Sequence, residues 1–173
     1  MPAITARQQL DGRLFGLRTD RYSWWVTFRE IATYMVPYRY RWLVTQNERN
    51  RGAIRTGAII DSTATIAARV LAAGMMSGIT SPTRPWFKLR MEGFDRDSVT
   101  PVNLWLAECE RRMMRVFQES NFYNCIAVVY MDLATFATAP MLIHEDYENV
   151  IDCSNPCAGE YYLGLGKNLR VEI

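Results

Sequence analysis

Thr100-Pro-Val-Asn-Leu-Trp-Leu-Ala-Glu-Cys-Glu-Arg-Arg-Met-Met-Arg-Val-Phe-Gln-Glu119 is the stretch whose secondary structure is clearest from the sequence. Its apolar residues recur at spacings of three and four, which predicts an amphipathic helix over about 101–119. Thr100 suits the cap position and Pro101 the first helical position. The opposite face carries the charge pairs Glu108–Arg112 and Arg115–Glu119, each four residues apart. The expected buried stripe consists of Val102, Trp105, Leu106, Cys109, Met113, Val116 and Phe117.

Further helices are expected on both sides of this one. A capping box at Thr5-Ala-Arg-Gln8 predicts a short helix that Gly12 and Gly16 weaken. An apolar stripe predicts a helix over about 20–35, which Pro37 ends. A helix rich in Ala and Gly is expected over residues 61–77, and another over residues 121–136, which Asn121 is expected to cap and which should be buried nearly all round.

Short strands are expected mainly after Pro140, where the helical period ends. The expected strands are Trp86–Met91, Met141–His144, Val150–Cys153, Tyr161–Leu165 and Leu169–Ile173. The fold class is therefore α+β, mostly α-helical, with an antiparallel β-rich segment at 138–173. The predicted organisation is one domain over 1–173. The expected packing anchors are Trp86, Phe87, Trp105, Phe122 and Phe136.

The 173 residues include 49% apolar and 22% charged side chains, both near the average for globular proteins. The 20 Lys and Arg and 18 Asp and Glu are unevenly placed. Residues 1–90 carry 14 basic and 5 acidic side chains, whereas residues 91–173 carry 6 basic and 13 acidic ones. This asymmetry indicates surfaces that meet different partners, or each other. No uncharged run is long enough to span a membrane, so no membrane contact is expected.

The polar segment with the clearest functional character is residues 37–57, which we call the basic arm. Tyr38, Tyr40 and Trp42 alternate with Arg39 and Arg41. In an extended chain one edge would be aromatic and the other cationic, which suits base stacking and phosphate contact. Pairing of the arm with acidic residues of the second half, or of a neighbouring subunit, is the alternative. The arm also contains Arg49, Arg51 and Arg55.

No motif in the chain predicts an enzyme, a cofactor or a metal site. Gly166-Lys167 lacks the other residues of a phosphate-binding loop, and Cys153 and Cys157 lack a second pair of ligands. His144 is the single His, and a surface position is its ordinary role. A hydrolase using His144, Glu145 and Asp146 stays open as an alternative, as does a stand-alone nucleic-acid-binding module that uses the basic arm.

One long run resembles a known family. Asp61-Ser-Thr-Ala-Thr-Ile-Ala-Ala-Arg-Val-Leu-Ala-Ala-Gly-Met-Met-Ser-Gly-Ile-Thr-Ser-Pro-Thr-Arg-Pro-Trp-Phe-Lys-Leu89 is similar to the signature of the head-to-tail connector (portal) proteins of short-tailed bacteriophages. Shorter pieces follow in the family's order, among them Ser120-Asn-Phe-Tyr123 and Gly159-Glu-Tyr-Tyr-Leu163. The family often has Gly after the Phe that ends the buried helix, where this chain has Ala137.

The resemblance implies the N-terminal, wing-type part of a longer, non-enzymatic portal protein. Such a protein forms a homo-oligomeric ring of about twelve subunits at a capsid vertex of the virion and is assembled in the host cytoplasm. Double-stranded DNA is packaged through the ring by a separate terminase ATPase and is later ejected through it. The implied protein partners are the capsid protein, the terminase and tail adaptor proteins. The chain ends within an expected strand, Asn168-Leu-Arg-Val-Glu-Ile173, which agrees with a fragment or the ordered part of a longer protein.

Overall fold

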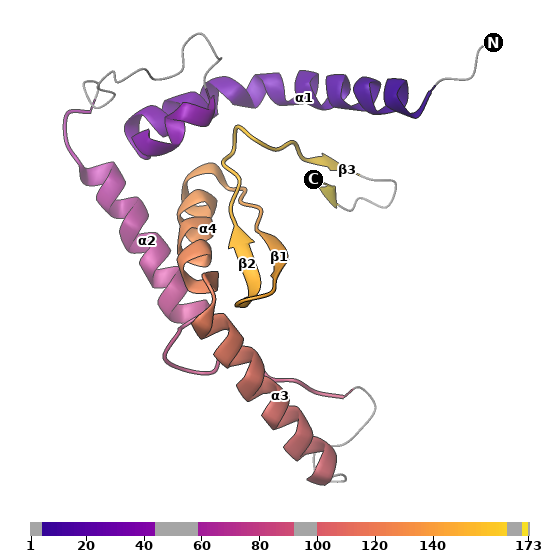
Figure 1. The fold of residues 1–173 in the computed structure, drawn as a ribbon. Coiled ribbons are helices and arrows are strands. Elements are labelled where there is room, and N and C mark those ends of the chain that lie inside the picture. The colour runs from indigo at the N-terminus through magenta and orange to yellow at the C-terminus, as the bar shows by residue number, and fades with distance from the viewer. Residues whose placement is uncertain (1–4, 44–58, 92–99, 166–170, 173) are drawn as a thin grey trace. The chain divides into compact units, whose positions relative to one another are not determined.

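The computed structural model describes residues 5–43, 59–91, 100–165 and 171–172 (Figure 1). The chain forms two compact units: unit 1 comprises Met1–Ile66 with Pro156–Ile173, and unit 2 comprises Ala67–Asn155. The described residues are mostly helical, with short antiparallel strand pairs towards the C-terminal end, which confirms the predicted fold class. The single domain over 1–173 stays a prediction.

Unit 1 is built on one long helix, α1 (Ala6–Tyr34). The backbone N–H of Thr5 donates to Oε1 of Gln8 at 3.0 Å, as the predicted capping box requires. The sequence predicted two helices, but α1 continues through Gly12 and Gly16. An isolated Gly costs a helix only about 1 kcal/mol, and propagation through it is easier than nucleating a second helix.

The segment that follows α1 is a 3₁₀-helix, η1 (Pro37–Leu43), and not the extended chain considered for the start of the basic arm. Val36 and Leu43 are fully buried and hold the two ends of this segment in unit 1. The Oγ1 of Thr65 donates to the backbone oxygen of Met35 at 2.9 Å. This bond provides a partner for a carbonyl at the helix end, where the helix itself provides none.

Unit 1 is completed by residues of the C-terminal segment. Strands β3 (Gly164–Leu165) and β4 (Val171–Glu172) pair antiparallel, within the longer strands predicted there. A Cβ added at Gly164 would lie 3.0 Å from Cδ2 of Leu17 on α1, so the chain passes close to α1 at this glycine.

Unit 2 contains residues 67–79 of α2 (Thr63–Ile79), an extended segment over residues 80–91, and α3 (Thr100–Glu119). The strand predicted for Trp86–Met91 is wrong. The backbone N–H of Leu89 donates to Oε1 of Glu110 at 2.6 Å. A side chain of α3 therefore satisfies a backbone group that a neighbouring strand would otherwise satisfy.

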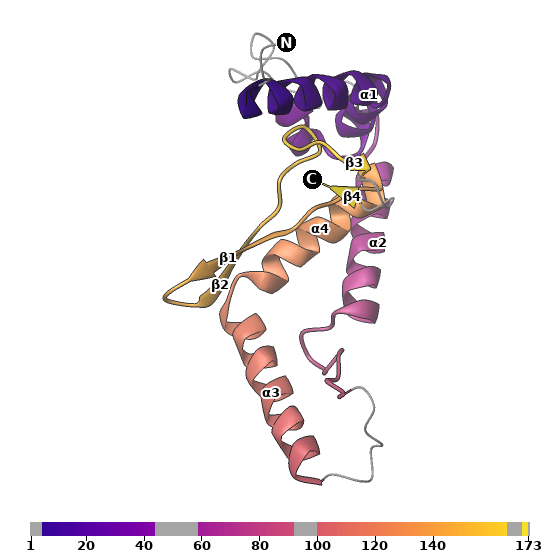
Figure 2. The same cartoon turned by 90° about the vertical axis from the view of Figure 1, so that its right-hand side faces the viewer.

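After α3 come α4 (Phe122–Phe136) and a β-hairpin formed by β1 (Leu142–Asp146) and β2 (Val150–Ser154). These strands pair antiparallel, with His144 opposite Asp152. Figure 2 shows the hairpin extending away from α4, to the left in that view. We call residues 142–154 the acidic hairpin, because they contain Glu145, Asp146, Glu148 and Asp152 and no Lys or Arg.

Asn121 joins α4 to the acidic hairpin. It occupies the predicted cap position, but its side chain makes no capping hydrogen bond. Its Oδ1 instead accepts from the backbone N–H of Cys153 at 2.8 Å. Its Nδ2 donates to the backbone oxygen of Cys153 at 2.9 Å and to Oδ1 of Asp152 at 2.6 Å. The predicted capping role is therefore replaced by a contact that holds strand β2 beside the start of α4.

The core of unit 2 is an aromatic cluster around Phe122, which is 4% exposed. The ring of Phe122 lies 4.5 Å from that of Phe117 and 6.2 Å from that of Trp86, centroid to centroid. Phe136 is buried in α4, and Phe87 is half-buried with its ring 4.9 Å from Trp86. Four of the five expected packing anchors thus lie in or beside buried regions.

Trp105 is the exception, because 63% of its surface is exposed. At 3.6 residues per turn, Trp105 lies about 120° around α3 from Phe117. The buried stripe that the sequence predicted for α3 is therefore wider than the face of α3 that the rest of unit 2 covers. Helix α4 is also less buried than predicted, since Val128 and Leu133 are 37% and 39% exposed.

Ala137, which follows α4, has a φ of 60° in the left-handed region and its N–H donates to the backbone oxygen of Leu133. The left-handed conformation costs a residue with a Cβ about 1–2 kcal/mol. We expect Ala137→Gly to raise the free energy of unfolding by about 1 kcal/mol, measured by urea denaturation. The matched variant Ala134→Gly lies within α4 and should lower it by about 0.5–1 kcal/mol. Destabilisation by both variants would contradict the left-handed assignment.

Candidate interaction surfaces

The backbone of the described part of the basic arm, η1, is a 3₁₀-helix rather than the extended chain that the predicted aromatic and cationic edges require. In a 3₁₀-helix residues two apart lie on different faces. Tyr38 is 54% exposed, and the guanidinium carbon of Arg39 lies 5.8 Å from its ring centroid. The structure does not describe the side chains of Tyr40, Arg41 and Trp42, nor any part of Arg49, Arg51 and Arg55.

Arg21 forms an aromatic cluster in unit 1 that sequence reasoning missed. Its guanidinium carbon lies 5.1 Å from the ring centroids of Trp25 and Tyr162, and 5.8 Å from those of Phe28 and Tyr161. Its Nη1–H also donates to the backbone oxygen of Tyr161. Burial lowers the pKa of Arg21, an effect that the nearby Tyr162 and Tyr161 oppose. The cluster attaches the segment after Pro156 to α1 through cation–π contacts. The spacing of Arg21, Trp25 and Phe28 on one helix face was the available signal.

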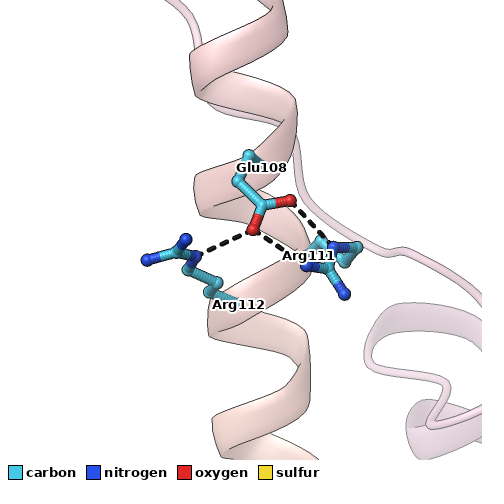
Figure 3. Close-up of polar contacts among 3 residues, drawn as sticks. All are labelled: Glu108, Arg111 and Arg112. Atoms are coloured by element: carbon cyan, nitrogen blue, oxygen red, sulfur yellow. Dashed lines mark hydrogen bonds and ion pairs between the residues drawn. The ribbon is translucent and has the colours of Figure 1, made fainter.

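An exposed ionic group lies on α3 (Figure 3). Glu108 accepts two hydrogen bonds from Arg111, at 2.9 and 2.8 Å, and one from Arg112 at 2.8 Å. Arg115 donates to Glu119 at 2.7 Å. Both charge pairs predicted at a spacing of four are therefore confirmed. The hydrogen bonds from Arg111 and Arg112 lower the pKa of Glu108 to about 2, and the bond with Glu108 raises the pKa of Arg111.

The depressed pKa of Glu108 predicts a pH dependence of stability. The ordinary pKa of a Glu is 4.5, and that of Glu108 in the folded protein is about 2. The stabilisation that ionised Glu108 gives the folded state is therefore fully present above about pH 4.5 and is lost as the pH falls towards 2. In urea titrations the wild type should lose more stability across this window than Glu108→Gln, and the two should converge near pH 2. Parallel pH profiles for the two proteins would show that the ionic group contributes nothing measurable, as many surface ion pairs do.

A groove of about 500 Å³ lies in unit 2 between α3 and the segment that starts at Pro82. Its cationic lining side chains are Arg84, Arg111 and Arg115, with Glu110 as the acidic one, and Phe87 and Met114 contribute apolar surface. Arg84 donates to the backbone oxygens of Ser77 and Gly78 at the end of α2, at 3.1 and 3.4 Å. Gln118 of α3 donates to the backbone oxygen of Pro82 at 3.4 Å. The bond of Gln118 joins the two walls of the groove, and the bonds of Arg84 hold the segment after Pro82 to the end of α2.

The residues of the alternative hydrolase do not converge. His144 and Glu145 are successive residues of β1, so their side chains leave opposite faces of the strand. Asp146 accepts hydrogen bonds from the backbone N–H groups of Glu148 and Asn149 and from Nδ2 of Asn149, and these bonds lower its pKa. Within the described ranges no group of three or more His, Cys, Asp or Glu residues could hold a metal ion. No helix among the described residues has the length and apolar character needed to cross a membrane.

Comparison with known proteins assigns the chain to a family. Residues 7–172 match the sequence profile described as bacteriophage head to tail connecting protein. The chain belongs to this family. It is 40% identical over 171 residues to a probable portal protein of Bordetella phage BPP-1, covering 99% of this chain and 30% of the relative. It is also 38% identical over 161 residues to a portal protein of Salmonella phage epsilon15, covering 93% and 29%.

This match to the head to tail connecting proteins includes all the elements described above except the first residue of α1. The run Asp61–Leu89, on which the resemblance was based, forms α2 and the extended segment that lines the groove. The chain spans about 30% of the length of the two relatives.

Proposed function

We propose that this chain contributes to a subunit of a phage portal, a ring at one vertex of the capsid to which the tail attaches. The observation that carries this proposal is the match over residues 7–172, together with relatives named portal proteins at 38–40% identity. In this proposal the subunits form a closed ring of about twelve copies. The chain supports the ring and the passage of DNA, and it has no catalytic role.

The exposed apolar side chains of the helices support an assembled state. Phe15, Tyr22 and Trp24 on α1 are 74%, 77% and 61% exposed, and Leu104 and Trp105 on α3 are 67% and 63% exposed. Large apolar side chains at protein–protein contacts supply most of the binding energy. We propose that these helix faces contact neighbouring subunits in the ring.

The proposed partners outside the ring are the capsid protein, the terminase ATPase that packages double-stranded DNA, and tail adaptor proteins. The proposed location is the virion. The charge difference between the two halves of the sequence supports contacts between unlike surfaces of neighbouring subunits. Such heterologous contacts generate a closed ring when the rotation between copies fits.

Mass photometry and negative-stain electron microscopy of the longer portal protein that the resemblance implies, with the 173-residue chain as the comparison, test this proposal. We expect annular particles with rotational symmetry from the longer protein, with a mass that is a fixed multiple of its monomer mass, whereas the 173-residue chain alone should not close well into a ring. Titration with salt should separate ionic from apolar contributions to assembly, because exposed charges are screened by salt. A longer parent protein that stays monomeric at micromolar concentration and in low salt would overturn the proposal.

A further inference from the structure

We propose that the acidic hairpin of one copy of this chain docks in the groove of a neighbouring copy. This inference rests on the proposed function, because it assigns one contact within the proposed ring. It joins two features of unit 2 that the function above does not use: a cationic groove with apolar walls, and an acidic hairpin with an exposed aromatic residue at its turn. The occupant is a second copy of the chain, and both partners in the contact are described by the structure.

Charge complementarity is the first argument. The two segments that form the groove, residues 80–91 and 100–119, contain six basic and three acidic side chains. The acidic hairpin contains four acidic side chains and no basic one. Arg111 and Arg115 are 70% and 72% exposed in spite of their ion pairs on α3, so their remaining N–H groups stay accessible. An Arg can bind a second carboxylate with these donors because its guanidinium has five N–H groups.

The second argument is the fit of an apolar anchor. Tyr147, at the hairpin turn, is 95% exposed, and Val150 beside it is 58% exposed. The groove offers Phe87 and Met114 together with Pro82 and Pro85 as apolar walls. Tyr is enriched among the residues that dominate binding energy, because it buries a large rigid ring at low entropic cost. A volume of about 500 Å³ lies within the range of sites that enclose such groups.

The third argument concerns size and rigidity. The groove follows α3 from Ala107 to Gln118, which is about 16 Å at 1.5 Å per residue. Each five-residue strand of the hairpin is about 17 Å long. The hairpin is held by the three hydrogen bonds of Asn121, and its turn is held by Asp146. A preorganised element loses little conformational entropy on binding.

The arrangement within unit 2 makes this contact heterologous. In Figure 2 the hairpin extends from α4 on one side, while residues 80–91 run along the other side of α3. The hairpin and the groove are therefore different surfaces of one copy, so each subunit can donate its hairpin to one neighbour and accept that of another. Repetition of such a contact produces a ring when the rotation closes.

The test measures assembly of the full chain by sedimentation velocity over a concentration series. Tyr147→Ala should weaken association by about 30-fold, the effect of losing an interface anchor. Glu148→Arg should weaken it by about tenfold. Glu148→Arg is then combined in turn with Arg84→Glu, Arg111→Glu and Arg115→Glu. At least one of these double variants should restore association to within about threefold of wild type. Circular dichroism and thermal melting confirm that each variant is folded.

A matched control reverses the charge of Glu30, an exposed residue of α1 in unit 1. Glu30→Arg should not be rescued by any of the three groove reversals. If the wild type assembles but Tyr147→Ala assembles equally well, or if no groove reversal rescues Glu148→Arg, the hairpin contact is overturned while the portal assignment stands. If groove reversals impair DNA binding and leave assembly unchanged, the groove binds phosphates and the proposal is overturned. A wild type that never associates overturns the portal assignment and this contact together.

Discussion

Phe122→Ala is expected to lower the free energy of unfolding of unit 2 by about 3–5 kcal/mol, the range for removing a large buried aromatic side chain. Phe122 is 4% exposed and its ring contacts those of Phe117 and Trp86. Its truncation removes the centre of the aromatic cluster and leaves a cavity that the neighbouring rings cannot fill without losing their own contacts. Urea denaturation followed by tryptophan fluorescence measures the loss, because Trp86 belongs to the same cluster.

Trp105→Ala is the informative comparison. The sequence predicted Trp105 as a buried packing anchor, whose truncation would cost about 3–5 kcal/mol, whereas its 63% exposure predicts less than about 1 kcal/mol in the monomer. Weaker ring assembly without loss of monomer stability would place Trp105 at a contact between subunits. An equal loss of monomer stability for both variants would contradict the burial described for α3.

The second large effect concerns the basic arm and DNA. If its Arg residues neutralise about three to five phosphates, log K should fall with log salt at a slope of roughly −3 to −4.5. Between 50 and 200 mM salt this corresponds to a loss of affinity of about 10²-fold or more. Fluorescence anisotropy with a duplex of arbitrary sequence measures the slope. The relevant residues are Arg39, Arg41, Arg49, Arg51 and Arg55.

Replacing all five Arg residues with Ser should abolish most of this salt dependence. The matched control replaces Arg7, Arg13 and Arg18 on α1, which should leave the slope nearly unchanged if the arm is the DNA contact. A flat salt response of the wild type would favour the alternative pairing of the arm with acidic protein surfaces. Strong DNA binding by a chain that never forms rings would support the stand-alone nucleic-acid module instead of the portal.

Local sequence signals predicted most of the helices and the strands after Pro140, but they divided α1 into two helices and predicted a strand at Trp86–Met91 that is absent. The end of α1 shortly before Pro37, the end of α3 at Glu119 and the i,i+4 charge pairs of α3 all depend on residues close together in the chain. The strand predicted for Trp86–Met91 depended on β propensity alone, and propensity does not supply a partner strand. The backbone of Leu89 is bonded to Glu110, 21 residues further along the chain.

The candidate sites were less predictable than the fold. The sequence predicted the charge of the basic arm, but its aromatic edge required an extended backbone, and η1 is helical. Arg21 and Tyr161 are 140 residues apart, so their contact had no local signal. The groove also combines two segments that were predicted separately, one as a strand and one as an amphipathic helix, and no local pattern placed them beside each other.

By itself the sequence determined the fold class, the positions of the main helices and the membership of a phage connector family, because all three depend on local patterns and on a specific run of residues. The tertiary structure decided which face of α3 is buried and that Asn121 holds the acidic hairpin rather than capping α4. It also brought Arg84, Arg111 and Arg115 to one groove. The physical reason is that burial and hydrogen bonding depend on which distant segment lies against a side chain, and periodicity within one element does not specify that segment.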